Sequence, residues 1–134
     1  MKVWHLYDKV YRAWVCIVVS SRDEFVDFID GCGYKDMDFV RELVGGGQGA
    51  MMRITPADNE VGNNCVVVWM QQWRAATLVH EISHLTSQIL SDCLVPVNHD
   101  NTEAIAFYSE FWWTEINRAK RRWPDGNKHS DVQK

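Results

Sequence analysis

The hydrophobic positions in the first half of this chain follow the patterns of β-strands. Four segments predict strands: residues 3–11, 12–20, 50–55 and 65–70. The first two are rich in Val, Ile, Tyr and Trp, and residues 66–69 form a continuous apolar run typical of a buried strand. Tyr7-Asp8-Lys9 is the expected turn between the first two strands, and turn residues at 56–59 and 62–64 separate the last two.

Elsewhere the apolar positions recur with the period of a helix. A short helix is expected at about 22–30, where Ser21 and Glu24 fit a capping box. A longer helix is expected at about 73–92, with an apolar stripe formed by Leu78, Ile82, Leu85 and Ile89. The last is expected at about 102–123, with an inward stripe formed by Ile105, Tyr108, Trp112, Ile116 and Ala119.

Two segments in the middle of the chain are less regular. Residues 36–44 fit either a short helix or a turn, and the pattern does not decide between them. The glycine-rich segment 45–49 lacks the lysine and hydroxyl of a phosphate-binding loop, which favours a flexible connection.

These elements together predict an α+β fold. A small antiparallel or mixed β-sheet is expected to pack against the helix at 73–92 and against a second long helix. Residues 1–124 are expected to form a single domain, and the polar residues 125–134 a disordered C-terminal tail.

Composition limits the class of protein. The 134 residues carry a formal net charge of −4, which argues against a nucleic-acid partner. The longest apolar run, residues 13–19, is too short to span a bilayer, and the N-terminus lacks the pattern of a signal peptide. Four widely spaced cysteines are typical of reduced, buried thiols, so a cytoplasmic location is expected, without a membrane partner. Seven tryptophans are expected to pack in the core and at its rim.

The pentapeptide His80-Glu81-Ile82-Ser83-His84 has the form H-E-x-x-H. On a helix, positions i and i+4 share one face, so both imidazoles can bind one metal ion. Glu81 is turned to the side, where its carboxylate can reach a water molecule on that metal. The motif predicts one Zn²⁺ per chain, with Glu81 as the general base.

A catalytic zinc ion needs a third protein ligand. A pattern with a further histidine six residues after His84 is excluded, because Leu90 occupies that position. Glu103, nineteen positions past His84 on the next helix, is the predicted third ligand, because two antiparallel helices joined by a loop can bring it to the histidines. Glu110 on the same helical face is the reserve candidate, and Glu103 also fits a capping box with Asp100.

The motif followed by this glutamate resembles the gluzincin branch of the zincin metallopeptidases. A weaker resemblance is to small zincin-like proteins of tailed bacteriophages, which have a His-Glu helix followed by a D-N-x-E-A helix. Both resemblances cover about residues 78–108. They imply a minimal zincin-like fold, in which His80, His84 and Glu103 bind zinc, Glu81 is the base and the strand at 66–69 binds the peptide substrate. Phe107 stands where the commonest gluzincins have a histidine-orienting aspartate.

Three further residues are candidates near the metal. Asp100 is the expected partner that orients a ligand, His99 is a loop histidine that could also bind metal or the transition state, and Tyr108 fits either an oxyanion donor or the core. The expected function is a zinc metallopeptidase acting on a peptide or protein. The alternatives are a non-catalytic binding or regulatory protein of zincin fold and a metal-dependent hydrolase of a non-peptide amide. The oligomeric state is not determined by the sequence.

Overall fold

The computed structural model describes residues 1–127. Its elements follow in the order β1 (Lys2–Asp8), β2 (Ala13–Val19), α1 (Arg22–Gly31), α2 (Met37–Gly45), β3 (Gly49–Ile54), β4 (Cys65–Met70), α3 (Ala75–Asp92) and α4 (Thr102–Arg122), with short 3₁₀ turns at Pro56–Asp58 and His99–Asn101. All predicted strands and helices are present, and the undecided segment 36–44 is the helix α2. None of the helices in the described part is long and apolar enough to cross a membrane.

The four strands form one mixed sheet in the order β1-β2-β4-β3. β1 pairs with β2 and β3 with β4 in antiparallel fashion, whereas β2 and β4 run parallel. The parallel pair arises because α1, α2 and β3 lie between β2 and β4 in the chain, a connection long enough for a crossover. The predicted α+β class is therefore confirmed, and β3 is an edge strand.

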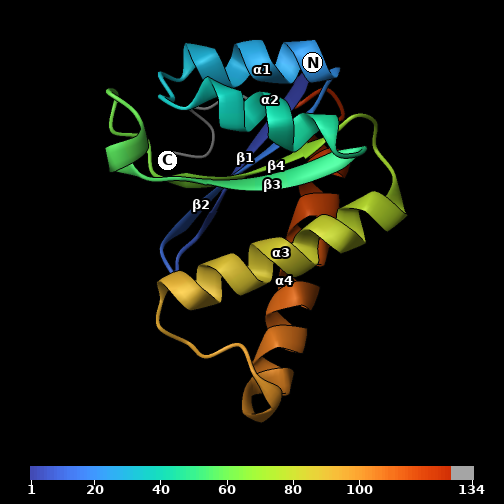
Figure 1. Cartoon of the computed structure of the whole chain (residues 1–134). Coiled ribbons are helices and arrows are strands. Elements are labelled where there is room, and N and C mark those ends of the chain that lie inside the picture. The colour runs from blue at the N-terminus through green and yellow to red at the C-terminus, as the bar shows by residue number, and fades with distance from the viewer. Residues whose placement is uncertain (128–134) are drawn as a thin grey trace.

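The sheet separates two layers of helices, with α1 and α2 on one face and α3 and α4 on the other (Figure 1). Side chains alternate between the faces, as the strand period of two requires. On the α3–α4 side, Ile17 and Val68 pack against Leu78, Leu85 and other residues of the two long helices. On the α1–α2 side a second core contains Phe25 and Trp69.

Local sequence signals define where the helices begin. The predicted capping box at α1 is present, because Ser21 Oγ accepts from the Glu24 amide at 3.1 Å and the Ser21 amide donates to Glu24 Oε1 at 3.0 Å. Asp36 caps α2 by accepting from the amide of Phe39 at 3.1 Å. The tryptophans behave as expected in part: Trp4, Trp69 and Trp112 are fully buried, whereas Trp113 is exposed.

Two expectations about chain ends and turns are corrected. The first turn lies at residues 9–12 rather than at 7–9, because Tyr7 and Asp8 are still paired with Trp14 and Ala13. The domain also does not stop at residue 124. Asn127 is buried and binds β1, with its amide donating to the Val3 carbonyl at 3.0 Å. Residues 128–134 of the expected tail lie outside the described residues.

Candidate metal centre

His80 and His84 lie one turn apart on the exposed face of α3, as their spacing predicts. Their Nε2 atoms are 3.2 Å apart. Two nitrogens that each lie about 2.0–2.1 Å from one tetrahedral zinc ion are about 3.3–3.4 Å apart. The separation of the imidazole pair is therefore close to the one that a shared zinc ion requires, and it is also that of a hydrogen bond between the two rings.

Glu81 differs from the two histidines because its side chain points inward. It is 3% exposed, and its Oε2 has no hydrogen-bond partner among the described residues. Burial raises the pKa of this carboxyl group, although the positive charge that His80 and His84 can carry acts in the opposite direction. A buried carboxyl group with a free oxygen and a raised pKa is typical of a general base or acid.

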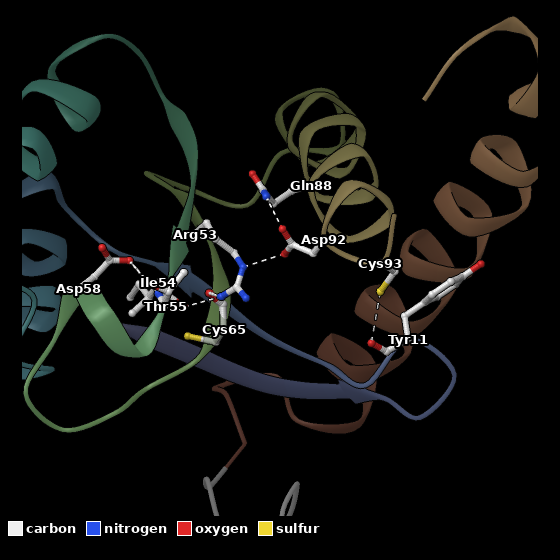
Figure 2. Close-up of polar contacts among 9 residues, drawn as sticks. All are labelled: Tyr11, Arg53, Ile54, Thr55, Asp58, Cys65, Gln88, Asp92 and Cys93. Carbon is white, nitrogen blue, oxygen red and sulfur yellow. Dashed lines mark hydrogen bonds and ion pairs between the residues drawn. The ribbon is translucent and has the colours of Figure 1, made fainter. Parts of the chain in front are cut away.

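α3 runs beside the edge strand β3 in the same direction, and contacts at both ends hold the two elements together. Near the start of β3, a Cβ atom on Gly49 would lie 2.6 Å from Thr77 Cγ2 and 3.2 Å from Glu81 Oε1. At the far end, Arg53 Nε donates to Asp92 Oδ2 at 2.8 Å, and Gln88 donates to the other oxygen of Asp92 at 2.9 Å (Figure 2). The roles of Gly49 and Arg53 are not visible in the sequence, because no local motif links β3 to α3.

A groove of about 590 Å³ lies beside His84, between β3 and the loop that leaves α3. Its walls are Met51, His84, Ser87, Gln88, Ser91 and residues 94–97. Leu94 in this loop is 90% exposed and has a positive φ of 61°, which is uncommon for a non-glycine residue. The exposed histidine thus borders an open, partly apolar depression next to the edge of the sheet.

Glu103 is not brought to the histidines. It is exposed in the first turn of α4, and the described residues contain no group of three His, Cys, Asp or Glu side chains that could hold a metal ion. The reason is the flank on which α4 packs. Ser109 on α4 donates to Thr86 on α3 at 3.3 Å, and at 3.6 residues per turn Thr86 lies about 160° around the helix from His84. Helix α4 therefore crosses α3 on the side away from His80 and His84, and Glu110 does not join these histidines either.

The other candidates lie away from the pair as well. Tyr108 is buried, and its hydroxyl donates to Asp8 Oδ2 at 2.7 Å. Burial and this bond raise the Tyr108 pKa, so the residue belongs to the core and not to an oxyanion site. His99 and Asp100 are exposed in the 3₁₀ turn, and no hydrogen bond joins Asp100 to His80 or His84 in the described part of the chain. The capping box of Asp100 with Glu103 does not form, because the N-cap residue of α4 is Asn101.

The strand expected to bind substrate is also corrected. Residues 66–69 lie in β4, which pairs with β2 on one side and β3 on the other. Both ladders of β4 are therefore occupied, and no peptide can add to it. The edge strand of the sheet that lies beside the H-E-x-x-H helix is β3.

No family model, curated protein or solved structure matches this chain.

Proposed function

We propose that this protein is a zinc-dependent metallopeptidase that acts in a cytoplasm, with one zinc ion per chain held by His80 and His84. The observation that carries the proposal is the 3.2 Å separation of the two Nε2 atoms on an exposed helix face, beside a buried carboxylate with a free oxygen. Glu81 lies about 60° around the helix from His84, close enough in direction to serve the same reacting centre.

A bound zinc ion would polarise a substrate carbonyl and acidify a water molecule. Glu81 takes the proton of the attacking water and passes it to the leaving nitrogen, a role suited to its raised pKa. The absence of a side chain at Gly49 leaves room for the Glu81 carboxylate, because a Cβ atom there would lie 3.2 Å from Glu81 Oε1. The edge of β3 offers backbone groups to an extended peptide, and the groove beside His84 receives one of its side chains.

The described residues do not supply a third protein ligand for the zinc ion beside His80 and His84. Glu103 as a ligand stays a prediction, and it requires α4 to change the flank on which it packs. The absence of a third ligand beside the two histidines among the described residues favours a second candidate function, a zincin-like protein that binds metal without turnover. The two functions differ in whether Glu81 has a reaction to catalyse.

Metal analysis of the purified chain is the first test. About one zinc ion per chain is expected, lost in His84→Ala and kept in the control His99→Ala. If Glu103 is not a ligand, Glu103→Ala binds zinc as tightly as the wild type. Absence of zinc binding in the wild type would overturn both candidate functions.

Cleavage of a broad peptide library is the second test. The wild type is expected to cleave, and Glu81→Gln is expected to keep zinc but lose at least about a hundredfold in rate, the usual contribution of a general base. Equal cleavage by Glu81→Gln would remove Glu81 from the mechanism. Zinc binding without cleavage of any library member would establish the non-catalytic candidate.

A further inference from the structure

A separate cavity of about 490 Å³ lies on the face of the sheet opposite to His80 and His84. Three of the four cysteines line it: Cys16 on β2, Cys32 at the C-cap of α1 and Cys65 at the start of β4. Phe28 and other apolar side chains complete the walls. The cavity lies where α1 ends at Cys32, and residues 62–64 before β4 form another part of its lining.

The walls of this cavity carry few ionisable groups. None of its described lining residues is an Asp, Glu, Lys or Arg, and the ionisable ones are His5 and the three thiols. Burial raises the pKa of the Cys16 and Cys32 thiols, and it raises that of Cys65 to about 11. All three thiols are therefore protonated at neutral pH. A protonated thiol is a small, polarisable apolar group rather than a nucleophile.

The side chains with polar atoms that line the cavity are those of His5, Trp14, Asn63 and Asn64. The two asparagines follow Gly62, whose φ of +82° favours glycine. A volume of 490 Å³ lies within the roughly 300–1,000 Å³ typical of small-molecule sites, which combine apolar walls with a few polar groups. A charged ligand would lose its hydration here, and none of the described lining residues is an Asp, Glu, Lys or Arg that would offset this cost.

We propose that this thiol-lined cavity is a binding site for a small, neutral, largely apolar molecule whose polar end meets the amides of Asn63 and Asn64. The site is independent of the proposed peptidase centre, from which the sheet separates it. Its ligand is distinguished from a peptide substrate by size and by the absence of charge.

Thiol protection in the full-length wild-type protein tests the site, with the neutral dye N-phenyl-1-naphthylamine as the probe. Cys32 and Cys65 are half-buried in the cavity wall, whereas Cys93 is exposed at the end of α3 and serves as the internal control. At a free dye concentration ten times its dissociation constant, about nine-tenths of the sites are filled. Alkylation of Cys32 and Cys65 by iodoacetamide should then slow about tenfold. The rate at Cys93 should not change. Equal rates with and without the dye at Cys32 and Cys65 would overturn the proposal.

A variant pair gives a second measurement. Cys32→Phe places a ring in the cavity and should weaken dye binding at least about tenfold, which corresponds to 1.4 kcal/mol. The control Cys93→Phe should bind the dye as the wild type does. So should His84→Ala, which removes one of the two histidines of the proposed zinc site. The anionic analogue 8-anilinonaphthalene-1-sulfonate should bind at least about tenfold more weakly than the neutral dye. Unchanged dye binding by a folded Cys32→Phe, or preference for the anion, would contradict the assignment.

Discussion

Two carboxylates are buried in the described part of the chain, and their surroundings differ. Asp8 accepts hydrogen bonds from the Tyr108 hydroxyl at 2.7 Å and from the Val10 amide at 2.9 Å. Glu81 is equally buried, but its Oε2 accepts none. A buried polar group without a partner costs stability, and it persists where it has a function. Asp8 therefore supports the fold at the end of β1, whereas Glu81 is the candidate for chemistry.

Replacement of Glu81 by Gln should stabilise the metal-free protein at neutral pH. The pKa of Glu81 is higher in the folded state than in the unfolded state. The wild type therefore loses stability as the pH rises from the unfolded-state pKa of Glu81 through its folded-state pKa. The uncharged amide avoids this loss, so the free energy of unfolding should rise by about 1 kcal/mol at pH 7.5 and change less at pH 4. Urea unfolding in EDTA at both pH values measures the difference, and destabilisation only at pH 7.5 would contradict this account.

The histidine pair predicts how zinc binding depends on pH. Each imidazole must be neutral to coordinate, so protons compete with the metal at His80 and His84. Zinc affinity should fall as the pH is lowered from 7.5 to 5.5, because protons compete with the metal for imidazole nitrogen. Calorimetric titration at the two pH values measures it. An unchanged affinity would show that these rings are not the ligands.

At the scale of elements, the decisive contact is that of α3 with β3. The tight approach at Gly49 and the ion pair of Arg53 with Asp92 hold the helix along the edge strand. This alignment places Glu81, His84 and the groove beside the one edge of the sheet next to α3. The site is consequently a property of two elements, neither of which contains it alone.

A methyl group on Gly49 should disturb this contact. In Gly49→Ala the new Cβ would lie 2.6 Å from Thr77 Cγ2, so the Thr77 side chain or α3 must shift, at a cost of about 1–3 kcal/mol. In the control Gly47→Ala no described atom lies within 4 Å of the added Cβ, and the change should stay within about 0.5 kcal/mol. Urea unfolding compares the two variants. Equal stabilities would show that β3 and α3 are not tightly packed at Gly49.

On the scale of the whole molecule, the sheet separates two cores and two candidate sites, and the described C-terminal residues join the first strand. Trp4 Nε1 donates to the Trp123 carbonyl at 2.7 Å. The Asn127 side chain accepts from the His5 amide at 2.7 Å and donates to the His5 carbonyl at 2.9 Å. An edge of β1 that would otherwise present free backbone groups is thereby covered at this point.

Loss of the Asn127 side chain should weaken the whole fold. Asn127→Ala leaves both backbone groups of His5 without these partners, so the free energy of unfolding should fall by about 1–3 kcal/mol. Asn117→Ala is the matched control, because that amide makes one exposed bond within α4 and should change stability by about 0.5 kcal/mol or less. A thermal or urea transition that is unchanged in Asn127→Ala would contradict the proposed clamp.

Much of the fold is predictable from the sequence, because the relevant interactions are local. The capping box of Ser21 and Glu24 and the stripe of α3 depend on residues three or four apart. The first turn was misplaced, because strand pairing extends β1 through Asp8 against the weak turn signal at residues 7–9. Helix α2 was also ambiguous, since its local signal is the short Asp36 cap and the packing of Val40 and Val44 in the second core supports the rest.

By itself, the sequence determined that His80 and His84 share one helical face with Glu81 beside them, because the helix period alone sets those directions. Only the tertiary structure decided which neighbours that face has. It placed β3 rather than β4 at the edge of the sheet, α4 on the opposite flank from the histidines, and three distant cysteines around one cavity. These outcomes depend on contacts between residues far apart in the chain, which minimise exposed apolar area over the whole molecule and leave no local pattern in the sequence.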